Sequence, residues 1–167
     1  VREKFLLGLP LTGEGISGKV LIKLCAGGIS YMNDKLTQLR EKFAEDHFVV
    51  QGIGATIEEA SYGYAKCSMD IEPRHCNCLG VLMGGATFTL ADHAFAVASN
   101  QEGREVVTQA SQITFLSPVK GKHLTAVARQ VKDGNKVCFY EIDVSDELGT
   151  KVAFMTVNGY VTKDGAQ

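Results

Sequence analysis

The sequence predicts an α+β fold in which an antiparallel sheet wraps around one buried helix. Residues 84–100 form an Ala-rich segment that is apolar nearly all round, which is typical of a helix buried on most sides. Strand-like runs lie before and after this segment, and runs separated by such short turns pair antiparallel. The chain has 167 residues, of which 45% are apolar, so it can build the core of one domain. A sheet packed on a single helix is the simplest architecture that buries this helix.

The first predicted element is a helix that begins at Asn33 or Asp34, either of which is a good N-cap. Leu36, Leu39 and Phe43 then fall on one helical face. After a turn at 61–63 and a loop over 72–83, the helix over 84–100 follows. The predicted strands, six in all, cover about 53–60, 62–71, 105–117, 123–133, 136–146 and 151–162. Asp133-Gly134 and Leu148-Gly149 are turn signals between the last strands.

Residues 1–31 differ from the rest because they are Gly-rich and irregular. Residue 1 is not Met, whereas Met32 stands directly before the first predicted helix. We therefore expect 1–31 to be an N-terminal extension, outside the native domain, and 32–167 to be a single domain. An intact mass of the natively expressed protein that included residues 1–31 would contradict this.

Composition excludes several classes of protein. The net charge is −2, and no cluster of Lys and Arg indicates nucleic acid or a membrane surface as a partner. No apolar run reaches the roughly 18 residues of a membrane helix. The five cysteines are odd in number and form no disulfide framework, which favours a reduced, cytoplasmic protein.

Asp92 and the pair Gly84-Gly85 are the candidates for chemistry within the apolar helix. A carboxylate buried without a partner costs several kcal/mol, so Asp92 is either paired, exposed or functional. Gly84-Gly85 leaves the N–H groups at the helix start sterically open, at the positive end of the dipole. Such N–H groups suit a carbonyl oxygen that becomes an oxyanion, although a Gly pair also serves a tight turn.

Helix geometry separates these two groups. Gly84 and Asp92 lie eight residues apart, which is roughly 12 Å along the helix axis. A reacting carbonyl must lie about 3 Å from both its donor and its base. If both groups act, they come from different subunits, and catalysis requires a dimer with two equivalent sites.

The order and spacing of residues here resemble the PaaI-like hotdog thioesterases over residues 50–162. The matching residues are Asn77-x-x-Gly80-x-x-Met83-Gly84-Gly85, then Phe88-Thr89-Leu90-Ala91-Asp92-x-Ala94-Phe95-Ala96, then Ile113-Thr114-Phe115-Leu116-Ser117-Pro118. The resemblance implies the hotdog fold, with six strands around the long helix. It also implies dimers, commonly paired into tetramers, and hydrolysis of an acyl-CoA, often aryl or short- to medium-chain, without metal or cofactor.

The resemblance also implies roles for individual residues. Asp92 matches the catalytic acid, which acts as nucleophile or general base, and Gly84 matches the backbone donor to the thioester carbonyl. Asn77 matches a side chain that places the water or the thioester. Thr108 matches a position where some relatives carry a hydroxyl that aids the water.

Four further residues are expected to contact the substrate. They are Met83, Gly85, Phe88 and Phe95, although the two Phe side chains fill a core as easily as they line a pocket. Met83 departs from the family, which usually carries His there. Met cannot donate or take a proton, whereas the Gly84 N–H is a backbone group and is kept.

Other polar residues near the motif carry weaker signals. His93 points about 100° away from Asp92, so a packing or interface role is favoured. The Cys76-x-Cys78 spacing is poor for zinc, and no metal site is expected. Lys120 and Lys122 are candidates to meet coenzyme A phosphates, but each also suits an ordinary solvated surface.

Two other functions compete with thioester hydrolysis. A non-catalytic acyl-CoA binder would use the same pocket, and Met83 is the feature that favours it. A hotdog dehydratase or hydratase needs a His paired with a carboxylate at the substrate. Only His75 and His93 lie near the motif, and neither has an evident partner in the sequence.

Overall fold

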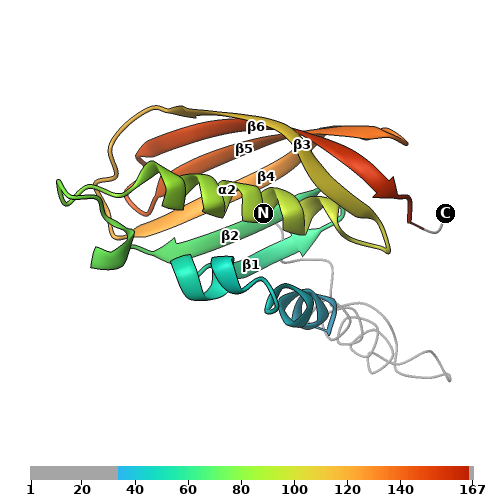
Figure 1. The fold of residues 1–167 in the computed structure, drawn as a ribbon, viewed down its shortest axis with the longest axis horizontal. Coiled ribbons are helices and arrows are strands. Elements are labelled where there is room, and N and C mark those ends of the chain that lie inside the picture. Colours follow the sequence, from blue (N-terminus) through green and yellow to red (C-terminus); the bar gives the residue numbers. More distant parts are fainter. Residues whose placement is uncertain (1–33, 166–167) are drawn as a thin grey trace, which may run out of the picture. The chain divides into compact units, whose positions relative to one another are not determined.

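A six-stranded antiparallel sheet and one long helix, α2 (Gly84–Ser99), make up most of the described part of the chain. The computed structural model describes residues 34–165, and the extension predicted over 1–31 lies outside them. From Leu36 onward the described residues form one compact unit. Figure 1 shows α2 running lengthwise along the sheet. The predicted α+β class and the wrapped helix are confirmed.

The strands follow one another along the chain much as the alternation of side chains predicts. Their bounds are β1 (Thr56–Ser61), β2 (Tyr64–Asp70), β3 (Glu105–Phe115), β4 (His123–Lys132), β5 (Val137–Asp146) and β6 (Lys151–Lys163). Their order in the sheet is β1-β2-β4-β5-β6-β3. Every neighbouring pair is antiparallel.

The core lies between α2 and one face of the sheet. Helix α2 contacts all six strands, and its Leu90, Phe95 and Val97 are fully buried. In β5 every second residue is buried, because successive side chains of a strand point to opposite faces. Small Ala side chains on α2 let the strands approach it closely. Within the described residues, no helix is long and apolar enough to cross a membrane.

The segment before β1 differs from the prediction. Residues 34–43 are helical as expected, but Phe48–Ile53 forms a π-helix, η1, and the strand predicted from residue 53 begins only at Thr56. Val49 and Ile53 are both buried, so four-residue spacing outweighs the strand preference of these β-branched residues. Gly54 then ends η1 with a left-handed φ of 65°.

The two edges of the sheet differ. At the β1 edge, Arg40 donates from Nε and Nη2 to the Ile57 carbonyl at 2.9 and 2.6 Å, which occupies that edge. At the other edge, β3 pairs with β6 alone among the described strands. Val107 and Phe115 of β3 are each more than half exposed. A long edge strand with exposed apolar side chains is a surface on which another strand can pair.

A buried guanidinium joins the far end of α2 to the turn between β4 and β5. Arg104 is only 4% exposed and forms an ion pair with Asp133. It also donates to the Tyr62 hydroxyl at 2.6 Å and to the Gly134 carbonyl at 2.7 Å. These partners come from two parts of the sequence, both distant from Arg104 itself, so the cluster ties the turns at this end of the sheet together.

We predict that Asp133→Ala destabilises the fold by about 3 kcal/mol, because it leaves a buried guanidinium without its counter-ion. The matched control is Asp143→Ala, which removes the exposed ion pair with Arg129 and costs less than about 1 kcal/mol. Urea denaturation measures both free energies of unfolding. Equal losses in the two variants would show that burial of Arg104 adds nothing.

Candidate active site

Asp92 lies in the middle of α2 and faces β3. Its Oδ1 accepts a hydrogen bond from the Thr108 hydroxyl at 3.0 Å. Thr108 faces the helix because it lies two residues beyond the buried Val106 on the same strand. A bulge at Gln109 follows directly and turns the rest of β3. The structure therefore brings two of the predicted site residues together.

The surroundings of Asp92 favour its protonated form more than water does. Burial raises the pKa of the Asp92 carboxyl, the Thr108 hydrogen bond lowers it, and the nearby charge of Asp46 raises it further. Burial is the largest of these causes, so the pKa lies above its ordinary value of 3.8. A carboxylate with a raised pKa is a better proton acceptor than one in water.

The first N–H groups of α2, at Gly84 and Gly85, receive no side-chain cap from Met83. Met83 is the N-cap residue, and its side chain makes no capping hydrogen bond to the helix. The Met83 carbonyl accepts the N–H groups of Ala86 at 3.0 Å and Thr87 at 3.4 Å. The N–H groups of Gly84 and Gly85 come first in the helix, where the helix itself supplies no acceptor.

The ring of Phe115 at the end of β3 packs over Gly84. A Cβ added at Gly84 would lie 2.9 Å from Phe115 Cζ, whereas one added at Gly85 would lie 4.0 Å from Met83 Cε. A side chain at position 84 would therefore require the exposed Phe115 ring or the helix start to shift, whereas one at position 85 would make only an ordinary contact. A groove of about 390 Å³ begins here, which we call the helix-start groove. Its lining residues are Val81, Leu82, Gly84, Thr87, Phe115, Leu116, Ser117, Pro118, Val119 and Val152.

The loop that leads into α2 is held by Asn77. The Asn77 Oδ1 accepts the N–H groups of Leu79 at 2.9 Å and Val81 at 3.2 Å. The N–H of Asn77 donates to the Val81 carbonyl at 2.8 Å, which closes the turn. The side-chain oxygen of Asn77 thus organises the loop, so any contact of Asn77 with a substrate comes from its amide NH₂ group.

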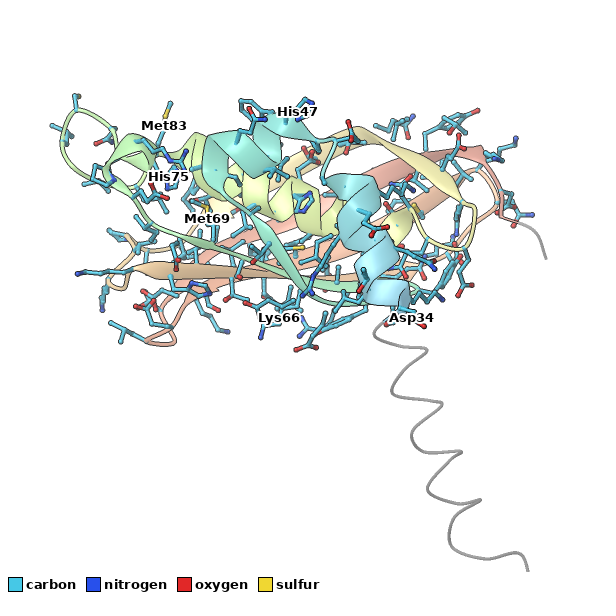
Figure 2. The ribbon with its side chains drawn as sticks, turned by 90° about the horizontal axis from the view of Figure 1, so that it is seen from below. Asp34, His47, Lys66, Met69, His75 and Met83 are labelled. Carbon is cyan, nitrogen blue, oxygen red and sulfur yellow. The ribbon has the colours of Figure 1, made fainter. Side chains whose placement is uncertain are left out.

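Met83 and His75 lie at the base of this loop and point in different directions. Figure 2 shows Met83 projecting away from the ribbon, with His75 turned toward the body of the protein. Met83 is 57% exposed and His75 only 4%. The Met83 N–H donates to the His75 carbonyl at 2.9 Å, and His75 Nδ1 accepts the Glu72 N–H at 3.1 Å. His75 therefore supports the residue that precedes Gly84.

The two Phe residues predicted to contact the substrate occupy different environments. Phe88 is partly buried and packs against the core, one turn beyond Gly84. Phe95 is 1% exposed and meets Tyr140 edge-on at 5.2 Å. The structure places Phe95 inside the core, and its contact with a substrate stays a prediction.

Two residues near the site had no role in the sequence analysis. Asp46 acts electrostatically on Asp92, although the two are far apart in the sequence and nothing in the pattern joins them. Phe115 belongs to the quoted motif, but its packing on Gly84 depends on how β3 ends beside the helix. The signal that the sequence offered for Phe115 was an aromatic residue near the end of the strand predicted over 105–117.

Comparison with known proteins gives the family. A family model described as the thioesterase superfamily matches residues 79–153. A putative esterase of Archaeoglobus fulgidus is 35% identical over 124 residues, covering 74% of this chain and 72% of the relative. The acyl-coenzyme A thioesterase PaaI of Escherichia coli is 31% identical over 123 residues, covering 73% and 88%.

Solved structures agree with the sequence relatives. The structure of Escherichia coli PaaI superimposes with a TM-score of 0.72 at 26% identity, over 81% of this chain and 99% of that one. A hypothetical thioesterase protein of Streptococcus pneumoniae with coenzyme A superimposes with a TM-score of 0.67 at 25% identity, over 74% of this chain and 99% of that one. With the sheet, the wrapped helix and the matched motif, these findings show that the chain belongs to the thioesterase superfamily as a PaaI-like hotdog thioesterase, a thioester hydrolase.

Proposed function

We propose that this thioesterase hydrolyses an acyl-CoA to the free acid and CoA, with Asp92 as nucleophile or general base. The observation that carries this proposal is the carboxylate of Asp92 held against Thr108 on a helix whose N-terminus is open at Gly84. The name of Escherichia coli PaaI and the coenzyme A in the Streptococcus pneumoniae structure support acyl-CoA as the substrate.

The proposed reaction uses the Gly84 N–H and the Asp92 carboxylate. The Gly84 N–H donates to the thioester carbonyl and holds the oxyanion as it forms. As general base, Asp92 takes a proton from water while the water oxygen attacks the carbonyl carbon. As nucleophile, Asp92 attacks directly and water then hydrolyses the anhydride. In both routes the C–S bond breaks, the acid forms, and the thiolate of CoA leaves and takes up a proton.

The site is built from two subunits in this proposal. The roughly 12 Å between Gly84 and Asp92 on one rigid helix keeps both from one carbonyl. The outer edge of β3 is unpaired among the described strands, and with its exposed Val107 and Phe115 it supports a second copy of the chain pairing there. Since Thr108 lies on β3 and Phe115 at its end, that pairing places both halves of the site next to the partner.

A non-catalytic acyl-CoA binder is the second candidate, and Met83 favours it. The exposed Met83 thioether supplies no proton donor at a position where the family resemblance implies a His. Calorimetry and thiol release from the same acyl-CoAs distinguish the two. Tight binding of acyl-CoA without release of CoA would establish the binder and exclude hydrolysis.

Asp92→Asn is expected to lower kcat by at least about a hundredfold, which corresponds to about 2.7 kcal/mol of barrier. The amide can neither take a proton nor attack effectively. Thiol release from benzoyl-, phenylacetyl- and straight-chain acyl-CoAs measures the loss and names the acyl class. Asp164→Asn, an exposed carboxylate just after β6, is the control and keeps the parent rate. An Asp92→Asn protein with parent activity would remove Asp92 from the mechanism.

Thr108→Val is expected to move the acid limb of kcat/KM to higher pH. The carboxylate of Asp92 is the active form, so activity falls as pH drops through the Asp92 pKa. The Thr108 hydrogen bond lowers that pKa, and without it the pKa rises further above 3.8. Thr114→Val, an exposed position of the same strand, is the control. A limb that stays in place or moves to lower pH would rule out the assigned hydrogen bond.

Gly84→Ala is expected to lower kcat by about a hundredfold, because the added Cβ meets Phe115 Cζ at 2.9 Å and displaces the oxyanion donor. Gly85→Ala has 4.0 Å of clearance and should lose much less. Both rates are compared under saturating acyl-CoA. An equal loss in the two variants would mean that the space at Gly84 is not what matters.

A further inference from the structure

The connection between β3 and β4, residues 116–122, passes the ends of β6 and β5 on its way to β4. It has no regular secondary structure, so hydrogen bonds to other segments must fix its path. At its start, the Val152 carbonyl of β6 accepts the N–H groups of Leu116 at 2.8 Å and Ser117 at 3.3 Å. This first half of the connection forms one wall of the helix-start groove, with Leu116, Ser117, Pro118 and Val119.

Asp146 joins the second half of the connection to the turn between β5 and β6. Its Oδ2 accepts the N–H groups of Lys120 at 3.0 Å and Gly121 at 3.1 Å. Its Oδ1 accepts those of Leu148 at 3.1 Å and Thr150 at 2.8 Å within the turn. Burial raises the pKa of the Asp146 carboxyl, and the N–H groups that it accepts lower this pKa by more, to about 2. Asp146 is therefore a buried anion at neutral pH, and all of its printed partners are backbone donors.

Glu147 extends the same arrangement by two residues. Its Oε1 accepts the Lys122 N–H at 2.8 Å, and its Oε2 accepts the His123 N–H at 2.9 Å. A Cβ added at Gly121 would overlap the Glu147 carboxylate, so this carboxylate lies directly against the backbone of the connection. The two neighbouring carboxylates thus bind four consecutive N–H groups, those of residues 120–123. Successive N–H groups that bind anions fix the course of the backbone that carries them.

Lys120 and Lys122 carry the positive charges of this connection. Both are exposed, and within residues 34–165 neither forms an ion pair. The nearby carboxylates of Asp146 and Glu147 bind backbone N–H groups instead, so the two ammonium groups remain available to another anion. They follow directly after the groove wall that ends at Val119. The phosphates of the acyl-CoA in the proposed function are anions that lysine binds.

We propose that Asp146 and Glu147 are positioning residues for substrate binding. By fixing the backbone of residues 120–123, they hold the ammonium groups of Lys120 and Lys122 in place for the phosphates of acyl-CoA. This inference rests on the proposed function, because it concerns the anionic end of the same substrate. Release of the connection weakens binding of the substrate and of the transition state alike. KM should therefore rise while kcat stays near the parent value.

The test compares Asp146→Asn with Asp143→Asn, the same chemical change on an exposed residue of the same strand. Asn has one acceptor oxygen, so it can hold the turn or the connection but not both. Thiol release is measured with the best acyl-CoA of the panel and with the N-acetylcysteamine thioester of the same acid, which has no phosphate.

Asp146→Asn should raise KM for the acyl-CoA about tenfold and keep kcat within about twofold of the parent. Loss of a negative charge alone would lower KM for an anionic substrate, so a rise reports lost positioning. For the phosphate-free thioester kcat/KM should change less than about twofold, because Val152 still holds the groove wall. Asp143→Asn should leave all of these constants at the parent values.

Glu147→Ala removes the hydrogen bonds to Lys122 and His123 from an exposed position, and it serves if Asp146→Asn folds poorly. It should raise KM for the acyl-CoA at least about threefold and spare the phosphate-free thioester. An unchanged KM in both variants would overturn the inference. An equal loss with both thioesters would also overturn it, because that result shows a general structural role.

A double-mutant cycle tests whether Asp146 acts through the lysines. The pair Lys120→Ala and Lys122→Ala should raise KM for the acyl-CoA selectively, and adding Asp146→Asn should raise it no further. A further rise, or a lysine pair without effect, would contradict the positioning role. A parent protein that releases no thiol from any acyl-CoA would refute the proposed function instead, and calorimetric Kd values for CoA in the same variants would then test the positioning alone.

Discussion

The rigid length of α2 between Gly84 and Asp92 is the constraint on which the rest of the site depends. A helix cannot bend its third turn back onto its first, so the Gly84 N–H and the Asp92 carboxylate of one chain stay roughly 12 Å apart. The sheet fixes this helix by contact with all six strands, and small Ala side chains allow that close packing. Burial in the sheet keeps α2 straight and also raises the pKa of Asp92. The packing of α2 against the sheet therefore both fixes the helix and raises the pKa of Asp92.

The two edges of the sheet differ in how far they can pair with another strand. Arg40 occupies the β1 edge by donating to the Ile57 carbonyl, whereas one side of the eleven-residue β3 pairs with no other strand of the described residues 34–165. The open strand is also the one that carries Thr108 and ends in Phe115. The same strand thus donates a hydrogen bond to the Asp92 carboxylate, packs on Gly84 and offers a surface for a second copy. This coincidence is what links oligomer formation to catalysis in our proposal.

The sequence predicted the elements whose signal is local. The all-round apolar pattern gave α2 to within a residue, and alternation gave five of the six strands to within about two residues. The π-helix at Phe48–Ile53 was missed because Val49, Val50 and Ile53 favour strands, while their burial is decided by contacts with α2. The Asp46 charge beside Asp92 and the Phe115 ring over Gly84 arise from packing between distant segments. Helix periodicity and strand alternation contain no information about such contacts. The roles of all the predicted site residues stay predictions, which are those of Asp92, Gly84, Asn77, Thr108, Met83, Gly85, Phe88 and Phe95.

The central claim is that one active site takes Asp92 from one subunit and Gly84 from the other, and subunit mixing tests it directly. Asp92→Asn and Gly84→Ala chains carrying different tags are co-expressed, and the mixed dimer is purified through both tags. We predict one doubly altered site and one intact site, so the mixed dimer recovers about half of the parent rate. A mixed dimer no more active than either altered homodimer would show that a single chain supplies both groups.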